Sequence, residues 1–238
     1  MLITAICPTY NHPQLLANSV RLWEMQSYPA RLRRLVILDD GGGFRSQAGD
    51  GWELVAAAGR FASLPEKYNA LLALAPPETD AFLVWEDDDV YLPDYVAAHA
   101  RVLRERELSK PSTVLSDYPG RIVVEHADGR FHSTLGFRRE LIERIGGWPL
   151  TKRADFDQQL IRTLQATAKS RASPWGGVDP RGIQFVYSWH TGAPHGQSTM
   201  RSPCDETWYD RAVVASPPRR DAILLPKLDE RTRRIMKW

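Results

Sequence analysis

Short apolar runs alternate with segments of helical periodicity along the first 110 residues. The apolar runs are rich in β-branched and aromatic residues, and turn-forming residues bound them, as is typical of buried strands. Leu16, Val20 and Trp23 recur at the spacing of one helix face. The pattern predicts strands at residues 2–7, 33–38, 53–56 and 81–85, a helix at residues 65–74 with Leu71 and Leu74 facing inward, and further helices beginning near Pro13 and Pro93.

This alternation predicts an α/β fold with a mainly parallel central sheet and helices on both faces. In such sheets, ligands bind at the carboxyl ends of the strands. Two predicted strands end in acidic residues, Asp39-Asp40 and Glu86-Asp87-Asp88-Asp89. We therefore expect both acidic segments to face one crevice.

The second half of the chain has a different pattern. Asp128-Gly129 is a hairpin-turn signal, and Gly146-Gly147 is typical of a helix C-terminus. The pattern predicts strands at residues 113–116, 121–125, 131–134 and 183–189, and helices at residues 138–145 and 155–167.

The acidic run at residues 86–89 is the strongest chemical signal. It follows an apolar strand directly, and like charges this close repel one another unless a cation lies between them. Oxygen ligands alone favour Mg²⁺ or Mn²⁺ over Zn²⁺. A solvated acidic turn is the alternative interpretation.

Composition narrows the class of protein. The 238 residues are 43% hydrophobic, which suits one α/β domain with a substantial core. The formal net charge of +2 gives no argument for nucleic acid or membrane binding. No apolar run is long enough for a membrane span, and the first residues do not resemble a signal peptide, so we expect a cytoplasmic protein.

Several short motifs, in the order in which they occur along the chain, resemble those of the family-2 glycosyltransferases with the GT-A fold. They are Ile6-Cys7-Pro8-Thr9-Tyr10-Asn11, Val36-Ile37-Leu38-Asp39-Asp40-Gly41, the acidic run before Tyr91-Leu92-Pro93-Asp94, Gly146-Gly147-Trp148 with Ala154-Asp155-Phe156-Asp157, and Tyr187-Ser188-Trp189 with His195-Gly196-Gln197-Ser198. The resemblance spans about residues 3 to 200. It implies one GT-A catalytic domain at residues 1–202, with a nucleotide-sugar half (1–110), an acceptor and catalytic half (111–202) containing a small antiparallel sheet, and a C-terminal tail at 203–238.

The resemblance implies that the acidic run is the family's Asp-any-Asp (DXD) metal motif, with Glu86 in place of the first Asp. We expect Asp88 and Asp89 to bind Mn²⁺ or Mg²⁺, and Glu86, Asp87 and Asp88 to face the nucleotide-sugar, with Asp88 in both roles. His195 would complete the metal shell, with His190 as its rival.

The family pattern also assigns donor-binding roles. Asp39 resembles the residue that accepts a hydrogen bond from the uracil ring, which makes a UDP-sugar the favoured donor. Lys67 and Asn69 match a family segment beside the base and phosphates, where a cation suits a diphosphate, although Lys67 could also be a solvated helix lysine. Trp148 could stack on a sugar ring or be plain core. The remaining expected donor-site residues are Pro8, Thr9 and Tyr10.

Asp155 matches the family's catalytic base, although Ala154 replaces the Glu that usually precedes it. The resemblance implies inversion at the anomeric carbon, which requires a carboxylate that takes the proton from the acceptor hydroxyl. Asp157 is the second choice. The alternative for Asp155 is a helix N-cap.

The expected activity is a hexosyltransferase-type reaction on a saccharide or other glycoconjugate. The basic tail leaves a glycosyltransferase acting on a hydroxylated nucleic-acid base as an alternative. A GT-A-like nucleotidyltransferase and a non-catalytic nucleotide-sugar-binding module are the others. The sequence does not determine the sugar or the oligomeric state.

Overall fold

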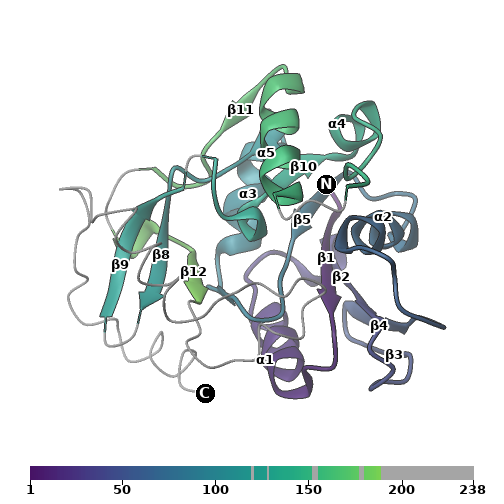
Figure 1. Cartoon of the computed structure of the whole chain (residues 1–238). Coiled ribbons are helices and arrows are strands. Elements are labelled where there is room, and N and C mark those ends of the chain that lie inside the picture. The colour runs from purple at the N-terminus through teal and green to yellow at the C-terminus, as the bar shows by residue number, and fades with distance from the viewer. Residues whose placement is uncertain (119–120, 128, 152–154, 177–179, 189–238) are drawn as a thin grey trace.

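The computed structural model describes residues 1–118, 121–127, 129–151, 155–176 and 180–188. These residues form an α/β structure with one large sheet, helices on both of its faces and a second, smaller sheet beside it (Figure 1). The predicted fold class is confirmed.

The large sheet has a parallel centre. Its eight strands lie in the order β11-β7-β10-β5-β1-β2-β4-β3. Strands β5, β1, β2 and β4 are parallel to one another, whereas β10 and β3 run antiparallel to their neighbours β5 and β4. The strands are β1 (Ile3–Thr9), β2 (Arg33–Asp39), β3 (Gln47–Gly49), β4 (Trp52–Ala56), β5 (Ala81–Val84), β7 (Leu108–Ser109), β10 (Gly136–Arg138) and β11 (Arg171–Ala172).

The helices cover the large sheet from both sides because its central strands are apolar on both faces. On β1, Ile3, Ala5 and Cys7 belong to one buried cluster with α1 and α3, whereas Ile6 belongs to a second cluster with α2, α4 and α5. This separation follows the two-residue period of a strand. The helices are α1 (Pro13–Glu24), α2 (Leu64–Leu74), α3 (Tyr95–Leu103), α4 (Arg139–Arg144) and α5 (Phe156–Thr167), with short 3₁₀ turns η1 (Ala30–Leu32), η2 (His132–Thr134) and η3 (Pro180–Gly182).

The expected small sheet is present and has the order β6-β12-β8-β9. It contains one parallel pair, β12 with β8, among its antiparallel pairs. Its strands are β6 (Val90–Tyr91), β8 (Thr113–Tyr118), β9 (Arg121–His126) and β12 (Phe185–Ser188).

Two local predictions are wrong. The segment 131–134 is not a strand, because Phe131 has a left-handed backbone (φ +56°) that turns the chain into η2. Leu74 does not face inward, since 39% of its surface is exposed at the last residue of α2. The predicted glycine ending of α4 is confirmed, with Gly146 and Gly147 at φ +77° and +87°.

Candidate active site

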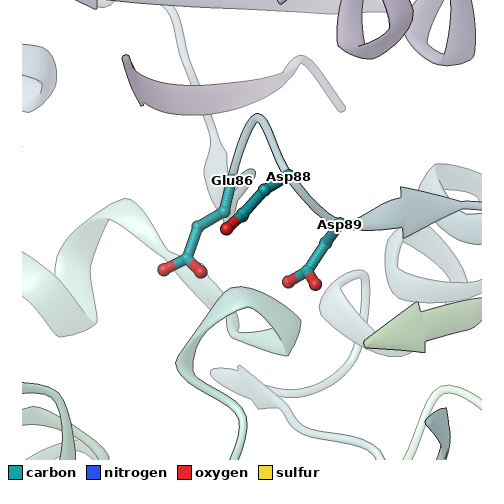
Figure 2. A group of neighbouring side chains, drawn as sticks. All are labelled: Glu86, Asp88 and Asp89. Carbon is teal, nitrogen blue, oxygen red and sulfur yellow. The ribbon is translucent and has the colours of Figure 1, made fainter. Parts of the chain in front are cut away.

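Three carboxylates gather in the turn between β5 and β6. Glu86, Asp88 and Asp89 each place an oxygen within 4.8 Å of the others. Figure 2 shows the three side chains projecting from this turn into the same space. The turn is anchored by Trp85, which is fully buried and donates its indole N–H to Ser19 (2.7 Å). The end of a core strand therefore concentrates negative charge at one point.

The electrostatics of this cluster fit a divalent cation. Burial, with the charges of Asp87 and Glu86, raises the pKa of Asp88 to about 8. Burial and the charges of Asp88 and Glu86 raise the pKa of Asp89 well above its usual range. Asp89 Oδ1 accepts the Ser188 amide (3.0 Å), and the nearby Ser133 side chain acts to lower the pKa of Asp89, but the buried Oδ2 has no hydrogen bond of normal geometry among the described residues. A hard cation would relieve both the repulsion and the unpaired oxygen.

Asp87 takes a different direction from its neighbours. Its Oδ2 accepts a hydrogen bond from the Thr9 hydroxyl at 2.5 Å and lies 3.6 Å from His12 Nδ1. The side-chain interaction with Asp87 raises the pKa of His12. Asp87 thus joins the turn to the end of β1 and lies outside the three-carboxylate cluster, whereas Glu86 belongs to it beside the two expected metal ligands.

Lys67 connects the ends of β1 and β2. Its buried ammonium contacts the Asp40 carboxylate and donates to the Thr9 carbonyl (2.5 Å). Asp40 also accepts the Phe61 amide at 3.1 Å. The alternative of a solvated helix lysine is wrong, because Lys67 is only 4% exposed. Through Thr9 and Asp87, the two acidic strand ends share one edge of the sheet, as expected.

Asp39 offers an open acceptor at this edge. Its Oδ1 accepts the amides of Gly41 (3.1 Å) and Asn11 (3.4 Å). Its Oδ2 is buried and has no hydrogen-bond partner among the described residues. A buried carboxylate oxygen in this state is suited to a ligand N–H.

Tyr10 and Pro8 lie on the same edge. Pro8 is half-buried within β1, and Tyr10 is half-buried just after it. The Arg60 guanidinium lies over the Tyr10 ring at 4.3 Å and donates to its hydroxyl at 2.9 Å. This pair gives the edge an aromatic and cationic rim.

Asn69 and Trp148 hold each other. The side-chain oxygen of Asn69 accepts a hydrogen bond from the backbone N–H of Trp148 (2.8 Å), and its side-chain nitrogen donates to the backbone carbonyl of Trp148 (3.1 Å). The Trp148 ring is 1% exposed and stacks on Tyr68 with a centroid distance of 4.7 Å. This packing agrees with the core alternative for Trp148 and leaves its ring no exposed face for a sugar.

His132 also belongs to this region, although no sequence pattern predicts a role for it. Its Nδ1 lies 3.2 Å from Glu86 Oε1, and its Nε2 lies 3.1 Å from the Trp148 indole nitrogen. No motif marks it in the sequence. The only signal available was a histidine in a polar segment predicted to be a strand.

Asp155 and Asp157 lie at the start of α5. Asp155 occupies the N-cap position without a side-chain capping bond. Its carboxylate accepts from the Gln159 amide (2.9 Å) and lies 3.5 Å from the exposed Arg162 guanidinium. The Asp157 carboxylate accepts hydrogen bonds from the backbone N–H (2.7 Å) and the side-chain amide (3.2 Å) of Gln158. The ring of Phe156, between them, meets the His132 ring edge-on at 6.0 Å, which links this helix start to the side chain beside Glu86.

The remaining candidates, His195 and its rival His190, lie outside the described residues, as does the tail at 203–238.

No protein-family model matches the chain, and no curated protein matches it in sequence. Solved glycosyltransferase structures do match in fold. S. aureus TarS 1–349 in complex with UDP-GlcNAc superimposes with a TM-score of 0.65 at 14% identity, over 84% of this chain and 62% of that one. Mannosyltransferase PcManGT from Pyrobaculum calidifontis, in complex with GDP-Man and Mn²⁺, gives 0.58 at 17% identity, over 82% and 59%. The chain has the GT-A fold.

The chain is shorter than these structures. It spans 60% of TarS 1–349 and 37% of the longer TarS structure. Among the described residues, no helix has the length and apolar character needed to cross a bilayer.

Proposed function

We propose that the chain is a metal-dependent, inverting glycosyltransferase of the family-2 type. It transfers a hexose from a nucleotide-sugar, with a UDP-sugar as favoured donor, to a hydroxyl of a saccharide or other glycoconjugate. The observation that carries the proposal is the convergence of Glu86, Asp88 and Asp89 at the carboxyl edge of a parallel sheet in a GT-A fold. The similar structures contain UDP-GlcNAc in one case and GDP-Man with Mn²⁺ in another.

The three carboxylates would hold Mn²⁺ or Mg²⁺, and His195 is the proposed further ligand. When bound, the cation neutralises the charge that develops on the diphosphate leaving group. The burial of Asp89 Oδ2 without a hydrogen bond of normal geometry among the described residues supports a ligand role for that residue.

Asp39 and Lys67 serve the nucleotide in different ways. Asp39 Oδ2 would accept an N–H of the base, since it is buried and has no other partner among the described residues. Lys67 holds Asp40 and the Thr9 carbonyl together, so its role is to fix the β1 and β2 ends that form the donor site.

Asp155 is the proposed base that takes the proton from the acceptor hydroxyl. The carboxylate lies at a helix N-terminus, where a negative charge is stabilised by the helix dipole. Gln159 holds one of its oxygens, and the side chain is 38% exposed, so an acceptor can approach it from solvent.

A thermal-unfolding panel tests the proposal. The chain is mixed with UDP-, GDP-, CMP- and dTDP-sugars, each with and without Mn²⁺. We expect the largest rise in Tm with a UDP-sugar and Mn²⁺ together, since a ligand at 100 times its Kd stabilises by about 2.7 kcal/mol. Absence of any stabilisation by nucleotide or metal would contradict the proposal.

A further inference from the structure

The turn that carries His132 has an unusual backbone. Phe131 adopts a left-handed conformation (φ +56°), which is uncommon for a bulky residue. Its carbonyl accepts the Thr134 hydroxyl (2.7 Å) and the buried Lys110 ammonium (3.3 Å). Backbone of this kind persists when its surroundings hold it in place and is frequent at functional sites. The side chain that it directs inward is His132, which is 6% exposed.

The partners of His132 determine which ring nitrogen carries the proton. The Trp148 indole N–H can only donate, and it lies 3.1 Å from His132 Nε2. Nε2 must therefore accept, so the proton of the neutral ring is on Nδ1. The Nδ1–H then donates to Glu86 Oε1 at 3.2 Å.

Glu86 Oε1 receives a second hydrogen bond. The hydroxyl of Tyr68 donates to it at 3.2 Å. The Tyr68 ring is fully buried and stacks on Trp148, so both donors come from a rigid aromatic group. Both donors bind Oε1, so Oε2 is the oxygen that remains available to a cation.

We propose that His132 is a positioning residue that holds Glu86 as a one-oxygen ligand of the cation. The inference rests on the proposed function, because it requires a divalent cation at the acidic cluster. Residues that orient metal ligands in this way commonly change metal affinity by about 10- to 100-fold when mutated. His132 also touches Phe156, and it therefore connects the metal ligand with the helix start that carries Asp155.

A matched pair of variants tests the position of the donor. The amide nitrogen of His132→Asn reaches the place of Nδ1, whereas that of His132→Gln reaches the place of Nε2. Mn²⁺ binding to each folded variant is measured without nucleotide, by the electron paramagnetic resonance signal of free Mn²⁺. We expect His132→Asn to bind within about threefold of the unmodified chain and His132→Gln to bind about tenfold or more weakly. An Asn variant as weak as the Gln variant overturns the assignment.

A double-mutant cycle with Glu86→Ala separates positioning from a general effect on folding. If His132 acts through Glu86, His132→Gln lowers Mn²⁺ affinity in the unmodified chain and has no further effect when Glu86 is absent. An equal loss in both backgrounds, or no loss in either, overturns the proposal. If the unmodified chain binds no Mn²⁺ without nucleotide, the inference is overturned, whereas the proposed function is overturned only if the nucleotide-sugar panel also shows no stabilisation.

Trp148→Phe gives a second route that leaves His132 in place. The variant keeps an aromatic ring against Tyr68 but removes the N–H that fixes the histidine proton on Nδ1. We expect Mn²⁺ affinity to fall about three- to tenfold, with the loss absent in the Glu86→Ala background. Unchanged affinity overturns the assigned tautomer.

Discussion

At the scale of single residues, the candidate site depends on charged side chains that are buried in pairs. Lys67 and Asp40 are 5% and 3% exposed at their side chains, and they contact each other directly. Removal of one charge from such a pair leaves the other uncompensated, which costs far more than loss of a surface pair. The ends of β1 and β2 therefore depend on both partners.

Lys67→Met should destabilise the chain by about 3 to 5 kcal/mol, because Asp40 remains buried without a counter-charge. The measurement is the free energy of unfolding in urea. The control is the double variant Lys67→Met with Asp40→Asn, which should recover part of the loss. Equal stability of the single and double variants would contradict the interpretation.

Asp155→Asn keeps the shape of the side chain and removes its basicity. If Asp155 is the catalytic base, turnover should fall about 10²- to 10⁴-fold while the Kd of the donor stays unchanged. The matched control is Asp157→Asn, two residues along the same helix start, which should have the smaller effect. A larger loss in the control would transfer the role to Asp157.

At the scale of elements, the Gly146-Gly147 turn brings α4 and the following segment into position. The Gly147 amide bonds to the Ile142 carbonyl (3.0 Å), and the Gly146 amide bonds to Glu143 (3.1 Å). The two glycines differ in their surroundings. A Cβ on Gly147 would lie 2.5 Å from Asn69 Oδ1, whereas a Cβ on Gly146 would meet nothing within 4 Å.

The two alanine variants should therefore differ in stability. Gly146→Ala should lower the free energy of unfolding by about 1 kcal/mol, because alanine is strained in the left-handed backbone conformation. Gly147→Ala also displaces Asn69 from the Trp148 backbone, so its loss should be about 2 to 4 kcal/mol. Chemical denaturation of both variants measures the difference. Equal losses would show that the Asn69 contact contributes nothing.

The elements that were predicted correctly share one property: the pattern that indicates each of them lies within its own residues. Helix α1 follows from its apolar stripe, and β5 follows from its apolar run. The wrong prediction at 131–134 has a non-local cause, since the Phe131 turn is held by Lys110 from a distant segment. Short strands such as β7 and β11 have two residues each and exist through pairing alone.

The candidate site shows the same division. The sequence located the acidic run, Asp39 and the helix start at Asp155 because each directly follows or begins a predicted element. The sequence favoured Asp88 and Asp89 as metal ligands, and the structure places a Glu86 oxygen within 4.8 Å of theirs. Side-chain directions within a turn, and the approach of His132, depend on packing that periodicity does not encode.

At the scale of the whole molecule, two buried groups should make stability depend on pH in opposite directions. His99 is fully buried and burial lowers its pKa to about 3, so the folded chain resists its protonation. Asp88 has its pKa raised to about 8, so the metal-free folded chain resists its ionisation. The first group destabilises the fold as pH falls below about 6.5, and the second destabilises it as pH rises from about 4 to 8.

His99→Leu should remove the acid-side loss. At pH 5, a histidine with an unfolded pKa near 6.5 and a folded pKa near 3 costs about 2 kcal/mol relative to neutral pH. Urea denaturation at pH 5 and pH 7.5, in the presence of a chelator, gives the difference for both chains. An unchanged difference between the two pH values in the variant would exclude His99 as its source.

Both outer strands of the eight-stranded sheet are very short. Strand β3 has three residues and β11 has two, so each border offers few backbone groups for another chain to pair with. At β3, Gly49 also lies against the Trp52 ring, where a Cβ would lie 2.3 Å from its indole nitrogen. Within the described part of the chain, the large sheet therefore offers little edge for strand pairing with other copies of the chain.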